Sequence, residues 1–382
     1  MPIIFGRIPY LLFLLVVPLT VFAQQDTVKS RFLFDGDFRF RAEQDWDSRK
    51  SDGSFRDDRS RLRYRLRAGV TYRHNNWSEV GARLRTGVSR KQQDPQLTLG
   101  DGFNEFGTLP IALEKAYFSV DRYGFHVWLG KNTYPFEKRN ELFWSDNVYP
   151  EGVFLRKVFD VSGSFIEKLE VNGGHFIINT RGSSFEEDSY FQGFQISTSF
   201  LENNIEIYPS VYLFKNIQNI PDGAATFFFD YSILHLGTTI KPFRRNNLSA
   251  EFDYYRNLED YRTNDSIAPA FKNQKNGWVA GVSLGRSKKK KDLRAKLTYM
   301  QMQRYAAVDF LAQNDWARWD YSSFGSPDGR LTNYKGFELV GSYMLQDNMK
   351  FTIKYYWVEQ LVPLGDFLET GQRIRFDIDI KI

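Results

Sequence analysis

The chain has 382 residues, and its 51 Lys and Arg against 46 Asp and Glu give a formal net charge of +5 at pH 7. It contains no cysteine, which excludes a thiol nucleophile, a cysteine-based zinc site and a disulfide framework. Aromatic residues make up 17% and charged residues 25% of the chain, a combination that an ordinary soluble domain buries only with difficulty. The basic residues alternate with apolar ones and form no continuous patch, so we expect no nucleic-acid partner.

The first 23 residues have the pattern of a secretory signal peptide. Arg7 is the only charged side chain before an apolar run from Ile8 to Val17. Val21 and Ala23 occupy the positions that small residues take before a signal-peptidase cut, here ahead of Gln24. The run is too short for a membrane-spanning helix, which needs about 20 apolar residues. We therefore predict a cleaved signal peptide over 1–23 and one mature domain over 24–382.

The clearest structural signal is the alternation of apolar and charged residues over 61–73. Leu62 and Leu66 fall on one side of this segment, whereas Arg63 and Arg65 fall on the other. Because successive side chains of a strand point to opposite faces, the pattern predicts a β-strand with one apolar and one cationic face. A helix would distribute these arginines around its whole circumference.

Sixteen segments have this character, although the alternation is weak in two of them, 152–159 and 169–179. They are 32–43, 60–74, 77–88, 111–120, 124–131, 152–159, 169–179, 190–200, 205–215, 227–240, 248–256, 277–286, 292–304, 335–345, 349–359 and 371–382. Connections after even-numbered segments are short and most of those after odd-numbered ones are long, as in outer-membrane barrels. We therefore predict an all-β fold, a transmembrane antiparallel up-and-down β-barrel of about 16 strands in the outer membrane. The consecutive aromatics 227–229 suggest a bulge or register shift there.

The sequence favours no catalytic centre. Its four histidines have no metal-ligand spacing, and no nucleophile elbow, phosphate loop or dinucleotide motif occurs. We expect no cofactor and no metal site, and we do not expect an enzyme. A Ser/His/Asp hydrolase assembled from residues distant in sequence stays open as a minor alternative.

The candidate functional feature is the cationic face of the first three predicted strands, which are neighbours in an up-and-down barrel. We predict that it lines the pore with Arg39, Arg41, Arg61, Arg63, Arg65, Arg67, Arg83 and Arg85. Rows of arginine favour the passage of anions. Interleaved acids such as Asp35, Asp37 and Glu43 allow the alternative of a salt-bridged interior with little selectivity.

The connection 132–151 is rich in aromatic residues and carries Glu137, Glu141, Asp146 and Glu151. An external loop in water rarely needs so many aromatics. We predict that this loop folds into the barrel and sets its acids opposite the arginines, forming a constriction with a transverse electric field. The alternative is an external loop that packs on its neighbours.

Three segments resemble the porins of the Bacteroidetes type: Gly36 to Arg41, Arg61 to Val70, and Trp144 to Gly152. Arginine-lined strands also occur in phosphate-selective porins and alginate-export barrels. The resemblance extends over the mature chain in layout and implies passive diffusion of small polar or anionic solutes, contact with outer-membrane lipid and, by analogy, a homotrimer. Outer-membrane barrels often end in an aromatic residue, whereas this chain ends in Ile382.

Two other functions stay open at this point. The first is a non-conducting outer-membrane barrel that acts as a scaffold or as a component of an export or secretion system. The second is a periplasmic all-β binding protein, because alternation alone fits a soluble sandwich as well as a barrel.

Overall fold

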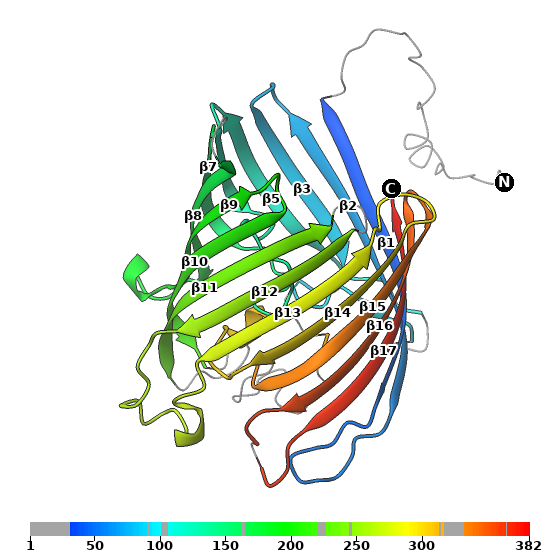
Figure 1. Ribbon diagram of the computed structural model, residues 1–382, viewed down its shortest axis with the longest axis vertical. Helices are drawn as coiled ribbons and strands as arrows, with labels where there is room; N and C mark the ends of the chain where they lie inside the picture. Colours follow the sequence, from blue (N-terminus) through cyan, green and yellow to red (C-terminus); the bar gives the residue numbers. More distant parts are fainter. Residues whose placement is uncertain are drawn as a thin grey trace, which may run out of the picture. The chain divides into compact units, whose positions relative to one another are not determined.

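The computed structural model describes residues 31–89, 92–100, 106–161, 165–219, 227–243, 247–312, 315–316, 332–363 and 365–382. The predicted signal peptide over 1–23 lies outside the described residues. Residues Phe32–Ile382 form one unit, in which a single antiparallel sheet curls round until its first and last strands meet (Figure 1).

Sixteen long strands and one two-residue strand, β4, are found within the described part of the chain. All sixteen predicted strands occur, with ends that differ by a few residues, including the two with weak alternation. The strands are β1 (Phe32–Trp46), β2 (Arg59–Arg73), β3 (Ser78–Thr86), β4 (Leu97–Thr98), β5 (Ile111–Arg122), β6 (Phe125–Lys131), β7 (Glu151–Phe159), β8 (Ile166–Asn179), β9 (Ser189–Phe200), β10 (Ile205–Gln218), β11 (Phe228–Phe243), β12 (Leu248–Asn257), β13 (Asn276–Gly285), β14 (Leu293–Met302), β15 (Tyr334–Gln346), β16 (Met349–Gln360) and β17 (Thr370–Lys381).

The sheet closes into a barrel because β1 pairs with both β2 and β17. In this seam Arg41 lies opposite Asp377 of β17 on one side and opposite Arg63 of β2 on the other. Each of the remaining long strands pairs with the long strand that follows it in the chain. Closure leaves no free edge, so every strand can satisfy its backbone hydrogen bonds, as a lipid environment requires. The predicted antiparallel up-and-down barrel is confirmed.

The two faces of the wall differ as the alternation predicts. On β2, Leu66 keeps 45% of its surface exposed whereas its neighbour Arg65 keeps 6%. Leu84 of β3 and Leu297 of β14 are exposed in the same way. The outer face of a transmembrane barrel is apolar because it contacts lipid, and the charged residues lie on the interior face.

The connections differ in length between the two ends of the barrel (Figure 1). Short turns lie at the end where β1 begins and β17 ends, and long connections lie at the other end. A register shift on β10 falls between Phe214 and Ile217, which lie opposite Tyr231 and Phe229 of β11. Asn216 takes a positive φ of 55° at this bulge, a conformation that asparagine tolerates better than most residues. The irregularity predicted near 227–229 is therefore present, with one extra residue on β10.

Helical structure within the described residues is limited to short 3-10 turns such as Phe185–Glu187, Pro269–Phe271 and Asp309–Leu311. No helix among these residues is long and apolar enough to cross a membrane.

Candidate pore and its constriction

The eight arginines predicted to line the pore, which we call the arginine wall, lie on the interior face of β1, β2 and β3. Most of them are buried, and each has an acidic partner. Arg39 pairs with Asp379, Arg41 with Asp377, Arg61 with Glu43, Arg63 with Asp94, Arg65 with Asp37, and Arg67, Arg83 and Arg85 all lie close to Glu114. Neighbouring carboxylates therefore neutralise most of the positive charge of this wall.

Glu114 is the centre of the largest of these groups. Its carboxylate lies 2.7 Å from Arg83, 3.2 Å from Arg67 and 3.8 Å from Arg85, and its side chain is fully buried. Glu114 reaches this position at a bulge: Arg83 pairs with Lys115, but the next residue of β3 pairs with Leu113, so Glu114 is the extra residue on β5. A bulge of this kind redirects a side chain, and here it points an acid at three arginines.

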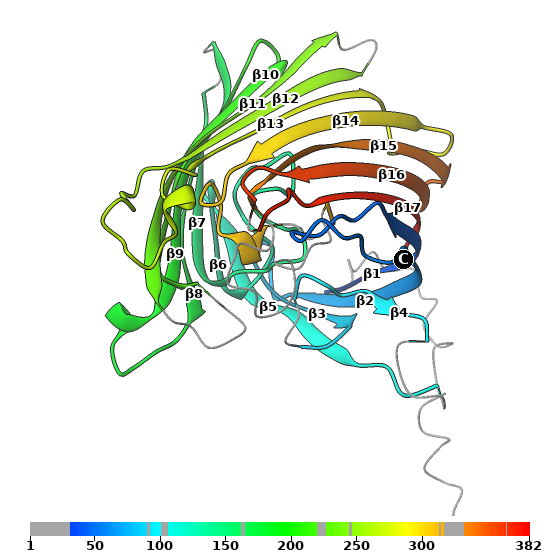
Figure 2. The same ribbon diagram turned by 90° about the horizontal axis from the view of Figure 1, so that it is seen from below.

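The connection 132–150, which we call the inner loop, folds into the barrel as predicted from its aromatic content (Figure 2). Phe143 stacks on Tyr255 of β12 with ring centroids 4.9 Å apart and an interplanar angle of 5°. Phe136 packs against Phe191 of β9. It occupies space left by Gly193, where a Cβ atom would come within 2.3 Å of the Phe136 ring. Interior aromatics of the barrel wall thus form the surface on which the loop rests.

Hydrogen bonds fix the inner loop from the other side. Asn147 accepts a hydrogen bond of 2.8 Å from Arg67, and the Tyr149 hydroxyl accepts one of 2.6 Å from Arg83. The backbone N–H of Ser145 donates to the carbonyl oxygen of Leu311 in the connection after β14. The arginine wall therefore has a structural role in this protein, because it holds the loop that narrows the barrel.

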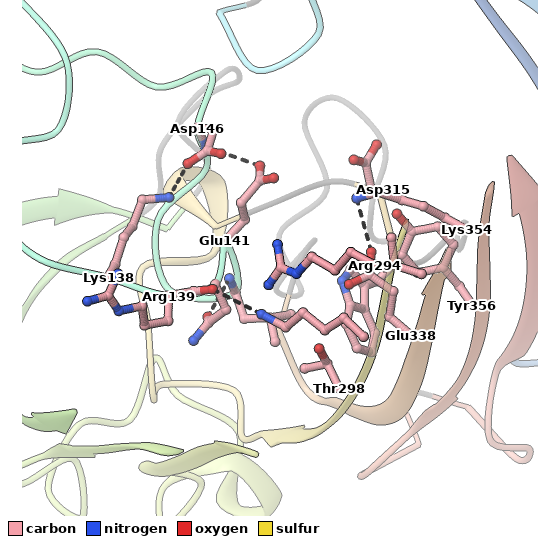
Figure 3. A pocket seen from close by; sticks show the side chains of 15 residues that line it. Lys138, Arg139, Glu141, Asp146, Arg294, Thr298, Asp315, Glu338, Lys354 and Tyr356 are labelled. Carbon is pink, nitrogen blue, oxygen red and sulfur yellow. Dashed lines mark hydrogen bonds and ion pairs between the residues drawn. The ribbon is translucent and has the colours of Figure 1, made fainter. Parts of the chain in front are cut away.

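A cavity of about 290 Å³, which we call the constriction cavity, lies between the inner loop and the wall formed by β14, β15 and β16 (Figure 3). The loop contributes Lys138, Arg139, Glu141 and Asp146 to its lining, and the wall contributes Arg294, Lys296, Glu338, Lys354 and Tyr356. Acids and bases of both signs thus face each other across a narrow space.

A second cavity of about 710 Å³, which we call the vestibule, lies toward the short turns. Arg139 and Arg294 line both cavities, so the two adjoin. Glu251 is the one acid in the vestibule lining, and it is paired with Lys296 at 2.6 Å. The basic residues of the lining are Arg139, Lys241, Arg286, Lys288 and Arg294. Arg139 and Lys241 share Glu206 as an ion-pair partner, so the remaining positive charge of the vestibule comes mainly from Arg286, Lys288 and Arg294.

The four acids predicted for the constriction have different positions. Glu141 and Asp146 line the constriction cavity. Glu137 does not line it and lies 3.1 Å from Arg139. Glu151 is the first residue of β7 and is on the same side of that strand as the exposed Val153, so it lies on the outer face, where it pairs with Lys131. Two of the four acids thus line an interior cavity, and their role in a constriction stays a prediction.

The pKa values of Glu141 on the inner loop and of Asp315 in the connection after β14 depart from their ordinary ranges in opposite directions. Burial raises the pKa of the Glu141 carboxyl, and the neighbouring carboxylates of Asp146 and Asp315 raise it further. Asp315 behaves in the opposite way: burial acts to raise its pKa, but the guanidinium groups of Arg375 and Arg41 hold it well below the usual range. Glu141 therefore takes up a proton at a higher pH than an ordinary glutamate does.

Comparison with known families agrees with this geometry. Residues 52–229 match the model of the family described as "Putative porin". Over this range the chain is similar to that family. The predicted resemblance to porins is confirmed, while the Bacteroidetes type stays a prediction. The chain lies in the outer membrane, as the family match and the fold both indicate.

Solved structures of porins share the fold of this chain. OprB of Pseudomonas putida at high pH has 12% identity and a TM-score of 0.56, over 92% of this chain and 94% of that chain. OmpF of Salmonella typhi, in a complex with daunomycin, has 13% identity and a TM-score of 0.55, over 92% of this chain and 97% of that chain. At such low identity the likeness is one of fold alone. No curated protein sequence matches this chain at a significant level.

A Ser/His/Asp set does occur inside this barrel, although no sequence signal pointed to it. Ser210 Oγ lies 3.3 Å from His235 Nδ1, and His235 Nε2 lies 2.9 Å from Asp253 Oδ1. All three side chains are buried, and the inner loop covers them through Asn140, which donates to Asp253 over 2.7 Å. Neither the constriction cavity nor the vestibule is lined by these residues. The set ties the inner loop to β10, β11 and β12.

The cationic residues of β14 and β16 are the functional candidates that sequence reasoning missed. Arg294 and Lys296 alternate with exposed leucines on β14, and Lys354 does the same with apolar residues on β16. The alternation predicted that these residues lie on the interior face, but β14 and β16 carry fewer basic residues than β2 does. Only the position of the inner loop shows that they border the open part of the interior.

Proposed function

We propose that the chain is a porin whose water-filled pore lets small polar solutes diffuse passively through the outer membrane, with a preference for anions. The observation that carries this proposal is the pair of adjoining cavities along β11 to β16, the larger of which has a lining dominated by basic residues. A cluster of one sign of charge in a low-dielectric wall raises the local concentration of solutes of the opposite sign.

In this proposal the arginine wall lies behind the pore on the side of β1, β2 and β3, since most of its side chains are buried. Its ion pairs leave less free charge there than the vestibule has, so it contributes to anion preference mainly through the overall field. The inner loop forms the constriction, with Glu141 and Asp146 set opposite the basic residues of β14 and β16. The transverse field of the constriction therefore runs between the loop and β14 to β16.

The test is single-channel conductance of the purified mature protein in a planar bilayer under a salt gradient. Discrete current steps, with a reversal potential that shows anion preference, support the proposal. Barrels that are folded, as judged by heat-modifiable migration in a detergent gel, but that never conduct would contradict it.

The buried aromatic cluster favours one other candidate function. Aromatic residues of the inner loop and of the strands from β7 to β12 fill much of the interior on that side. A barrel filled in this way could act as a non-conducting scaffold or as a component of an export system. The same recording separates the two functions, because the scaffold predicts no current from folded barrels.

We also propose that the barrel acts through binding and passage of solutes without catalysis, and that it assembles as a homotrimer by analogy with other porins. Native mass spectrometry of the detergent-extracted protein measures the assembly directly, and a monomer would contradict the trimer.

A further inference from the structure

The charges that line the constriction cavity are nearly all paired. Four basic residues and three of the four acids have a partner of opposite charge, either in the lining or behind it. Lys138 pairs with Asp146, Arg139 with Glu206, Lys296 with Glu251, Lys354 with Glu338, and Asp315 with Arg375. Opposite charges in contact cancel over a short distance in a partly aqueous space. A solute in the cavity therefore encounters few free charges.

Glu141 and Arg294 are the two exceptions within the described residues. The Glu141 carboxylate accepts a hydrogen bond of 3.2 Å from the backbone N–H of Asp146 and has no basic partner there. The Arg294 guanidinium projects from β14 into the cavity and forms no hydrogen bond or ion pair with a described residue (Figure 3). Both line the same cavity, yet they do not come within ion-pair distance of each other.

Two features keep these charges apart. Arg294 lies opposite Gly285 of β13 and Ser342 of β15, so the barrel register places no acid beside it. Glu141 is held on the inner loop, next to the buried residues Leu142 and Phe143. A carboxylate and a guanidinium fixed on opposite sides of a small space form a preorganised site, which need not be assembled when a solute arrives.

Such a site discriminates between solutes by the arrangement of their charges. A small anion is attracted by Arg294 and repelled by Glu141, and a small cation experiences the reverse. A solute that carries both an ammonium and a carboxylate group can pair with both residues at once, and the guanidinium can bind the carboxylate through two hydrogen bonds. The volume of about 290 Å³ is at the lower end of the range for ligand sites, which suits a small solute.

We propose that the constriction cavity selects zwitterionic solutes of the amino-acid type, with the solute carboxylate on Arg294 and its ammonium group on Glu141. This inference rests on the proposed porin function and defines its solute class. The vestibule, with its excess of basic residues, lies next to this site and draws carboxylate-bearing solutes toward it.

The experiment compares four solutes of similar size and different charge in proteoliposome swelling. Alanine is zwitterionic, lactate is an anion, alaninamide is a cation and lactamide is neutral, so lactamide flux normalises for pore size. With the full mature chain, alanine should permeate about two- to fivefold faster than lactamide, the range expected for one or two partly screened ion pairs.

Two variants assign the charges, and two more act as controls. Arg294→Gln should reduce the flux of alanine and lactate, whereas Glu141→Gln should reduce that of alanine and alaninamide and increase that of lactate. Arg294→Lys and Glu141→Asp retain charge and should preserve most of the alanine advantage. Arg262→Gln, which removes an exposed arginine that lines neither cavity, should leave the ratio of alanine to lactamide unchanged.

The outcomes separate this inference from the porin proposal. Conducting barrels in which alanine is no faster than lactamide, or in which neither Gln variant changes the ratio, overturn the zwitterion site and leave the porin function standing. Folded barrels that pass neither ions nor lactamide overturn both. An alanine advantage that each Gln variant abolishes supports the site.

Discussion

The interior of this barrel has two walls rich in basic residues, and they differ in what their charges face. On β1, Arg39 and Arg41 lie directly opposite Asp379 and Asp377 of β17 and form ion pairs with them. On β14, Arg294 lies between Gly285 and Ser342 and faces no acid. The first wall has more arginines, yet the second borders the cavities. The density of basic residues along a strand is therefore a poor guide to free charge, because the register with neighbouring strands decides which charges are compensated.

The largest effect should follow from removing the central acid of the arginine wall. Glu114→Gln leaves Arg67, Arg83 and Arg85 without their shared carboxylate in a buried site, and breaking a buried ion pair in this way destabilises a protein by about 3 to 5 kcal/mol. The denaturant midpoint of the heat-modifiable band measures the loss. Asp260→Asn, in an exposed pair with Arg262, serves as the control and should leave the midpoint unchanged. An equal midpoint for both variants would mean that the Glu114 carboxylate does not stabilise the buried arginines around it.

A second large effect should come from loosening the inner loop. Trp144 is buried, stacks on Tyr134 at 4.6 Å and donates its indole N–H to the Val148 carbonyl. Truncation of such a residue to alanine costs about 3 to 5 kcal/mol, so Trp144→Ala should release the loop and increase the single-channel conductance. Phe106→Ala changes a fully exposed aromatic and should not alter conductance. A smaller conductance in Trp144→Ala would show that the loop does not narrow the pore.

A moderate effect on selectivity should distinguish the two walls. Arg294→Ser removes an uncompensated charge from the edge of both cavities and should shift the reversal potential in a KCl gradient toward weaker anion preference. Arg65→Ser removes an arginine whose charge Asp37 already compensates, so the shift should be smaller. Even the triple variant Arg63→Ser, Arg65→Ser and Arg67→Ser should reduce chloride preference less, per charge removed, than Arg294→Ser. The reverse order would place the ion path along the arginine wall.

The smallest effect should be a change of selectivity with pH. The raised pKa of Glu141 means that this carboxyl takes up a proton at a higher pH than an ordinary glutamate, whose pKa is about 4.3. The constriction then loses one negative charge while Lys138 and Lys354 keep their positive charges, so anion preference should increase as the pH falls. Reversal potentials recorded from neutral to mildly acidic pH measure this change. The Glu141→Gln variant should show at every pH the reversal potential that the wild type reaches at acidic pH. If the reversal potential of this variant still changes with pH as in the wild type, Glu141 is not the group responsible.

The sequence by itself determined the strands, their faces and the way in which they are joined. The alternation over 61–73 is a local property with a period of two, so it places Arg65 inside and Leu66 outside without knowledge of any other strand. Alternation also located the other strands, and the lengths of the connections distinguished the two ends of the barrel. The aromatic content of 132–151 also predicted correctly that this loop packs inside, because buried aromatic surface must find other apolar surface.

The tertiary structure alone decided which charges are free. Glu114 reaches three arginines through a bulge, Arg294 remains unpaired within the described residues because of its register, and Ser210, His235 and Asp253 meet only because β10, β11 and β12 are aligned in one particular way. Glu151 was expected in the constriction but lies on the outer face, since its place on β7 sets its direction. Each of these outcomes depends on contacts between residues far apart in the chain, where a shift of one residue would exchange the partners.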